Sequence, residues 1–88
     1  MKYIERRPQF IKHYKKRIAF NAKMDQQFDE RLELFIKHRQ DPLLQNHVLK
    51  GDKLGLRAFS VTGDIRVVYK ETDDAYIFLD IGSHNQVY

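Results

Sequence analysis

Two stretches of the chain repeat their hydrophobic positions with the spacing of a helix. In the first, over residues 8–20, apolar side chains recur every three or four positions, at Phe10, Ile11, Tyr14 and Ile18. The second stretch begins after Asn21 and has the same spacing, at Met24, Phe28, Leu32, Phe35 and Ile36. This periodicity predicts two amphipathic helices, with Pro8 in the first turn of one and Asn21 as the cap of the other. Asp41-Pro42 ends the second helix, so the pair forms a helical hairpin.

The rest of the chain has the alternation of short strands. A weak strand is predicted over residues 2–6, and stronger ones over 56–61, 65–69 and 75–81, with turns at residues 62–64 and 72–74. Gly82 is expected to break the last strand, and residues 43–53 read as a connection. The predicted fold is therefore α+β, in the order β-α-α-β-β-β, as one domain over residues 1–88. The helix pair would pack on one face of a small twisted antiparallel sheet and leave the other partly open for binding.

Composition narrows the chemistry that this domain can perform. The 88 residues include no cysteine, which excludes disulfides, Cys-based zinc sites and thiol nucleophiles. There is no apolar run of the roughly 18 residues that cross a bilayer and no signal-peptide pattern, so a cytoplasmic protein without a membrane partner is expected. Phosphate-binding glycine loops and nucleophile-elbow motifs are missing too.

Positive charge is concentrated in the helical half. Residues 1–40 have a net charge of +6 and residues 41–88 a net charge of −2, within a total of +4. The polar face of the first helix holds four of the cations, Lys12, Lys15, Lys16 and Arg17. Such a face is either a solvated surface or a contact for an anionic partner, which would be nucleic acid or an acidic protein segment.

The remaining candidate groups are His, Arg, Asp and Tyr side chains. His13 and His38 are expected to be surface residues, and the histidines lack the spacing of metal ligands. Arg66 interrupts an apolar strand, either at an edge or facing an anion. This set suits RNA cleavage without a metal ion, in which the 2′-OH of the RNA is the nucleophile and the protein moves protons and stabilises the phosphorane.

Four segments occur in a characteristic order, namely His47–Gly51 (HVLKG), Leu56–Arg57 (LR), Gly63–Lys70 (GDIRVVYK) and Ile81–Tyr88 (IGSHNQVY). Together with the element order, they resemble the RelE/YafQ superfamily of bacterial and archaeal toxins, nearest its YafQ-like branch. The resemblance implies a type II toxin that cuts mRNA in the ribosomal A site and leaves a 5′-OH end. It also implies an antitoxin partner, contact with operator DNA only through that antitoxin, and no cofactor.

The resemblance assigns roles to individual residues of the C-terminal half. His84 matches the C-terminal histidine of the YafQ-like branch and would act as general acid or as base. His47 opens the H-x-L-x-G segment and would share the proton transfers with it, while Asp64 would orient a histidine or accept a proton. Arg66 would stabilise the phosphorane, and Tyr88 would stack on a base or assist proton transfer.

Further cations are expected at the RNA. Arg57 matches a basic residue on the sheet face of the RelE-like branch, and Lys50 belongs to the same candidate RNA surface. The lysine-rich face of the first helix would contact ribosomal RNA.

Three positions depart from the pattern of the branch and keep alternatives open. Ser60 stands where a second catalytic histidine is frequent, Asp80 where an arginine is frequent, and Ile65 where a tryptophan is frequent. A catalytically weakened toxin that binds an antitoxin or the ribosome without cutting is therefore the alternative to an active ribonuclease. A general basic RNA-binding module is a third, weaker alternative, since exposed aromatic motifs like those of RRM domains are missing.

Overall fold

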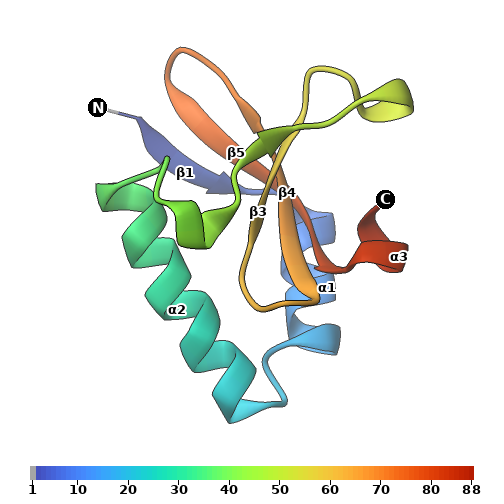
Figure 1. The fold of residues 1–88 in the computed structure, drawn as a ribbon. Coiled ribbons are helices and arrows are strands. Elements are labelled where there is room, and N and C mark those ends of the chain that lie inside the picture. The colour runs from blue at the N-terminus through green and yellow to red at the C-terminus, as the bar shows by residue number, and fades with distance from the viewer. Residues whose placement is uncertain (1) are drawn as a thin grey trace.

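A computed structural model describes residues 2–88 of the protein and contains the two helices and three C-terminal strands that the sequence predicts (Figure 1). The elements, in order, are β1 (Tyr3–Arg6), α1 (Pro8–Arg17), α2 (Ala22–Lys37), β2 (His47–Val48), β3 (Arg57–Ser60), β4 (Ile65–Glu71), β5 (Ala75–Ser83) and α3 (His84–Val87). Short 3-10 turns at Pro42–Leu44 and Gly51–Lys53 flank β2.

Asn21 caps α2 as predicted, because its side chain accepts hydrogen bonds from the backbone N–H groups of Lys23 and Met24. Both helices end earlier than expected, α1 at Arg17 and α2 at Lys37.

The five strands form a mixed sheet in the order β1-β5-β4-β3-β2, so the prediction of a wholly antiparallel sheet was wrong. β1 pairs with β5 in parallel, from Tyr3 opposite Ala75 to Arg6 opposite Phe78, whereas all other pairs are antiparallel. The antiparallel run from β3 to β5 leaves one edge of β5 free, and β1 fills the first half of that edge. The chain then turns at Arg7 into α1, which packs along the second half of β5.

Two predictions about irregular segments also need correction. Gly82 does not break the last strand, because β5 continues through it to Ser83. The stretch predicted as a connection contains a real edge strand, β2, which pairs with β3 through His47 opposite Ala58 and Val48 opposite Arg57.

The main core lies between the helix pair and one face of the sheet. Its largest buried side chains are aromatic, and Phe35 stacks on Phe59 with ring centroids 4.7 Å apart. Phe10 and Ile18 of the first helical stripe are buried in it, as their spacing predicts.

A second, smaller cluster covers part of the opposite face of the sheet, which we call the outer face. It consists of Leu49, Ala58, Val68 and Val87, with Leu56 packed against them. The outer face is thus partly covered by α3 and by residues from the 49–56 segment, and the rest of it is available for binding.

Within residues 2–88, no helix is both long enough and apolar enough to cross a membrane.

Candidate functional site

The short helix α3 positions two of the predicted site residues above the outer face. Val87 is buried in the outer-face cluster and fixes the helix to the sheet. A capping box at the start of α3, formed by Ser83 and Gln86, sets the direction in which the helix leaves β5. As a result the rings of His84 and Tyr88 meet edge to face, with centroids 4.5 Å apart.

Arg66 lies beside this pair of rings. It is opposite Gly82 in the β4–β5 ladder, one strand away from the residues that begin α3. Burial raises the pKa of the Tyr88 phenol, and the positive charge of Arg66 opposes that shift. Since α3 packs against β4 as well as β5, Arg66 and the two rings share this end of the outer face. The structure therefore brings Arg66, His84 and Tyr88 together.

Asp64 is at the edge of the same end of the sheet. It is exposed in the β3–β4 turn, where its backbone N–H donates to Thr62 Oγ1 at 3.2 Å. The next residue, Ile65, pairs with Ser83, so Asp64 lies next to the start of α3. A depression of about 470 Å³ lies here, lined by Lys16, Arg17, Phe20, Asp64, Ile65, Ser83 and Gln86.

His47 is on the outer face but reaches it from the other edge of the sheet. It pairs with Ala58, which belongs to the outer-face cluster, and directly paired residues project to the same side. Its ring Nδ1 lies 2.8 Å from the carbonyl oxygen of Gln45. A carbonyl only accepts hydrogen bonds, so Nδ1 holds the proton, and in the neutral ring Nε2 presents the basic lone pair.

Lys50 is close to Tyr88. A depression of about 400 Å³ between the 49–53 segment and the C-terminal end of α3 is lined by Leu49, Lys50, Asp52, Lys53 and Tyr88. Lys53 was not among the predicted site residues. It follows Lys50 by three residues in a segment without helical or strand periodicity, and the single 3-10 turn at Gly51–Lys53 brings it to the same depression.

Ser60 and Arg66 are joined on the outer face. Arg66 Nη1 donates to Ser60 Oγ at 2.9 Å, and Ser60 Oγ donates in turn to Gln45 Oε1 at 3.0 Å. Arg66 Nε is buried without a hydrogen-bond partner in the described part of the chain. Sequence reasoning singled out Ser60 only as a departure from the family pattern and did not identify Gln45.

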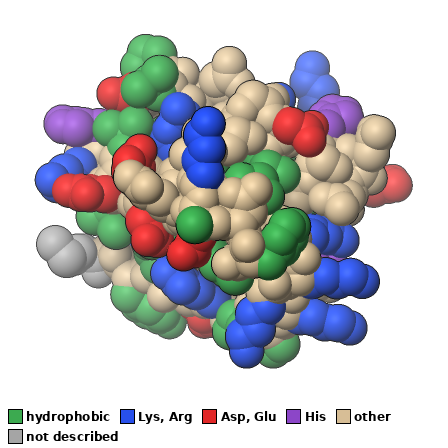
Figure 2. Space-filling model, turned by 90° about the horizontal axis from the view of Figure 1, so that it is seen from below, with side chains coloured by type: hydrophobic (Ala, Val, Ile, Leu, Met, Phe, Trp, Pro, Cys, Tyr) green, Lys and Arg blue, Asp and Glu red, His purple; other side chains and the backbone are tan. Residues whose placement is uncertain are grey.

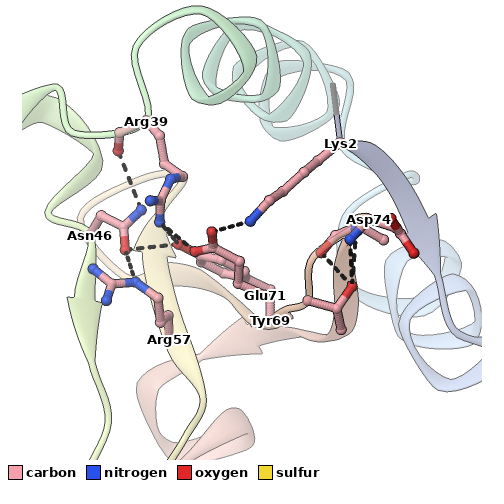
Figure 3. A network of polar contacts seen from close by, with 9 residues as sticks. Lys2, Arg39, Asn46, Arg57, Tyr69, Glu71 and Asp74 are labelled. Atoms are coloured by element: carbon pink, nitrogen blue, oxygen red, sulfur yellow. Dashed lines mark hydrogen bonds and ion pairs between the residues drawn. The ribbon is translucent and has the colours of Figure 1, made fainter.

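Arg57 does not join the other site residues. It pairs with Tyr69, whose ring is in the main core, so its side chain points to the helix-covered side of the sheet. There Arg57 Nε donates to Asn46 Oδ1 at 3.0 Å, and Tyr69 OH donates to the same oxygen at 2.9 Å (Figure 3). The network continues to Arg39, which contacts Glu71.

The cations of α1 divide into two groups. Lys12, Lys15 and Lys16 are exposed, and together with Pro8 and Ile11 they line an open surface groove. Figure 2, which views the molecule from below, shows Lys and Arg side chains gathered at its lower right. Arg17 is different, because its Nη1 donates to the carbonyl of Ile81 at 2.9 Å and only a fifth of the side chain is exposed.

Asp80 is occupied by contacts with α1. Its carboxylate accepts a hydrogen bond from Gln9 Nε2 at 3.2 Å, lies 2.6 Å from His13 Nδ1, and is 3.6 Å from Arg17 Nη1. The negative charge that replaces the frequent arginine is therefore paired at the helix–sheet junction. His13 is correspondingly less exposed than the sequence suggested, at 21% of its side chain.

Metal ligands are not clustered: within residues 2–88, no three His, Asp or Glu side chains lie close enough together to hold a metal ion.

Comparison with known proteins matches the chain to one family over nearly its whole length. Residues 2–88 match the family that is described as "Bacterial toxin of type II toxin-antitoxin system, YafQ". No curated protein sequence matches the chain.

Solved structures share the fold. A copper-bound mutant toxin from Helicobacter pylori is 29% identical, with a TM-score of 0.84 over 100% of both chains. A mutant of YafQ from E. coli is 23% identical, with a TM-score of 0.82 over 100% of this chain and 99% of that chain. The YafQ-like chain matched in the E. coli DinJ–YafQ complex is 24% identical, with a TM-score of 0.81 and the same coverage.

Proposed function

Because the chain belongs to the YafQ family of bacterial toxins of type II toxin–antitoxin systems, we propose that it is an endoribonuclease that cuts mRNA in the ribosomal A site. The observation that supports this most directly is the meeting of Arg66, His84 and Tyr88 at one end of the outer face. In-line cleavage by a 2′-OH needs a base, an acid for the leaving oxygen and a cation for the phosphorane, and His84 and Arg66 are side chains suited to the last two of these roles.

The geometry favours one division of labour between the two histidines. His47 keeps its proton on Nδ1, so its neutral ring offers Nε2 as a base for the 2′-OH. His84 would then be the acid that protonates the departing 5′-oxygen, and Asp64 would orient it. As the bond between phosphorus and the 5′-oxygen breaks, the products are a 2′,3′-cyclic phosphate and a 5′-OH, with no net change in protons.

Arg66 and Tyr88 would act on the phosphate and on a base. A guanidinium stabilises the extra negative charge that the phosphorane gains, and this charge is absent from the ground state. The phenol of Tyr88 keeps its proton at neutral pH, as phenols ordinarily do, and burial raises its pKa further. A neutral ring fits stacking on a base better than it fits the role of a proton acceptor.

Docking on the ribosome is proposed for the exposed lysines of α1 and not for Arg17, which is held by the Ile81 carbonyl. Replacement of Lys12, Lys15 and Lys16 by glutamine should weaken ribosome binding. The slope of the logarithm of the binding constant against the logarithm of the salt concentration should become shallower by roughly 2 to 3. The charge-matched control replaces three exposed lysines elsewhere, Lys23, Lys37 and Lys70. Equal binding by the two triple variants would show that α1 does not contact the ribosome.

An antitoxin partner is proposed from family membership, and the E. coli DinJ–YafQ complex is a precedent for such an assembly. A short acidic reading frame next to the gene, whose product restores growth when co-expressed with this chain, would support the pairing.

The cleavage proposal is tested by expressing the chain and mapping 5′-OH ends of mRNA, alongside His84→Ala and Arg66→Ala. The control is His38→Ala, which removes an exposed histidine at the end of α2. Cuts in register with codons that persist in the control and vanish in the two site variants are expected. If the protein cuts mRNA equally well without ribosomes, the proposal that cleavage takes place in the ribosomal A site is refuted.

Intact mRNA under wild-type expression would refute the ribonuclease. Co-sedimentation of that inactive protein with ribosomes would then favour the weakened binding protein as the remaining function.

A further inference from the structure

Gln45 and Ser60 form a bridge between two halves of the candidate site. Ser60 Oγ accepts from Arg66 Nη1 at 2.9 Å and donates to Gln45 Oε1 at 3.0 Å. The backbone carbonyl of the same Gln45 accepts from His47 Nδ1 at 2.8 Å. A single residue therefore holds the proposed base through its backbone and the proposed phosphate-stabilising group through its side chain.

The backbone of Gln45 is strained. It has φ 48° and ψ 40°, and it is the one non-glycine residue with positive φ in the described chain. The left-handed conformation costs an L-residue roughly 1–2 kcal/mol, and glycine would adopt it freely. Such strain persists where surrounding contacts demand it, frequently at functional sites.

Ser60 is equally unusual in its surroundings. It is the one polar residue among the buried side chains of residues 2–88, with 4% of its surface exposed. Its hydroxyl is the hydrogen-bond partner of Arg66, whose Nε is buried without a partner. The orientation of the guanidinium thus depends on Ser60 Oγ, and the donors not used by Ser60 stay available for an anion.

We propose that Gln45 and Ser60 are positioning residues that hold Arg66 and His47 in a fixed mutual arrangement for RNA cleavage. This inference rests on the proposed ribonuclease function. In this chain a serine–glutamine bridge occupies the place of the histidine that is frequent in the branch, so Ser60 would support catalysis without touching the RNA. Misplacement of a reacting group by about 1 Å can cost around 100-fold in rate.

The test separates positioning from folding by using the strain at Gln45. Gln45→Gly retains the carbonyl that holds His47, removes the side chain that holds Ser60, and relieves the left-handed strain. We expect its Tm to stay close to the wild-type value, because relief of the left-handed strain offsets the lost hydrogen bond and the freer unfolded chain. The cleavage rate at saturating programmed ribosomes should nevertheless fall roughly 10- to 100-fold. A purely structural role would lower Tm and rate together.

Three further variants complete the experiment. Ser60→Ala should lose a similar factor, Ser60→Thr should restore most of the rate because it retains the hydroxyl, and Ser60→Ala added to Gln45→Gly should cost little more. Gln40→Gly, in an exposed turn, is the matched control and should cleave at the wild-type rate. The losses should fall on kcat, since neither residue is placed against the RNA.

The outcomes separate this proposal from the function on which it rests. Full cleavage by Gln45→Gly and Ser60→Ala would overturn the bridge and leave the ribonuclease intact. Losses that multiply in the double variant would overturn the shared bridge. A wild-type protein that leaves mRNA intact on ribosomes would overturn both proposals together.

Discussion

Replacing Gly82 with alanine should destabilise the protein far more than an ordinary glycine-to-alanine change. A Cβ built on Gly82 would lie 2.7 Å from Arg17 Nη1 and 2.7 Å from Gln86 Oε1. Both atoms are ends of flexible side chains, but neither is free. Arg17 Nη1 donates to the Ile81 carbonyl, and Gln86 Oε1 accepts from the backbone N–H of Ser83 at 2.7 Å.

The magnitude follows from the two contacts that must be given up. Loss of the capping interaction at α3 costs about 1 kcal/mol, and loss of a hydrogen bond from a charged guanidinium about 1.5–3 kcal/mol. Alanine also stabilises by about 0.4–1 kcal/mol through the unfolded state, but Gly63→Ala shares that gain. A Cβ at Gly63 meets no atom within 4 Å, so it is the matched control.

The measurement is urea unfolding of the two variants and the wild type, followed by circular dichroism. Gly82→Ala should be less stable than Gly63→Ala by about 2.5–4 kcal/mol, the sum of the two losses. Because α3 begins two residues later with His84, mRNA cleavage should fall as well under conditions where the variant is fully folded. If the two variants unfold within about 0.5 kcal/mol of each other, the close approach at Gly82 does not constrain this region.

Other variants test the charge network, the C-terminal aromatic ring and a helix cap. The hydrogen bond from Lys2, and more weakly the charge of Arg39, hold the pKa of Glu71 below 4.5. Glu71→Gln should therefore lower the free energy of unfolding by about 1 kcal/mol at pH 7. This difference should shrink as the pH falls from 4.5 through the lowered pKa of the folded protein, where the wild-type carboxylate becomes protonated too. A loss that is constant from pH 7 to pH 3 would contradict the pairing. Tyr88→Phe should retain most of the cleavage rate and Tyr88→Ala should lose it, since the ring and not the proton is used; equal losses in single-turnover assays would favour proton transfer. Asn21→Ala should lower the free energy of unfolding in urea by about 1 kcal/mol, because the two backbone N–H groups that donate to the Asn21 side chain lose their acceptor. An unchanged unfolding midpoint would show that the cap contributes nothing.

The sequence predicts the parts of the fold that depend on local periodicity. Both helices, the Asn21 cap and the three C-terminal strands are found as predicted, although the ends of these elements shift by up to three residues. Alternation assigns residues to faces but not strands to neighbours, so the parallel pairing of β1 with β5 was not predictable. Gly82 looked like a break because glycine is rare inside strands, whereas the structure uses it for a close approach to Arg17.

The candidate site was predictable to the extent that it lies in contiguous motifs. Side chains alternate between the two faces of a strand, so Arg57 shares the core-facing side of β3 with Phe59. Only the resemblance to the toxin superfamily placed Arg57 at the RNA. The bridge through Gln45 had no signal in the sequence. It joins residues 15 positions apart, and its left-handed backbone position is filled by a residue type that does not mark such a conformation.

The parallel pairing of β1 with β5 also has a consequence for the order of events during synthesis. β1 is made long before its partner, residues 75–78 of β5, and His84 follows directly after β5. A nascent chain that stops short of β5 therefore lacks both the neighbour of β1 and the proposed general acid. Contacts between such distant segments slow folding, because the long intervening loop must be closed first. The sheet and the candidate site thus depend on the same late-made segment, and chains that lack it have neither.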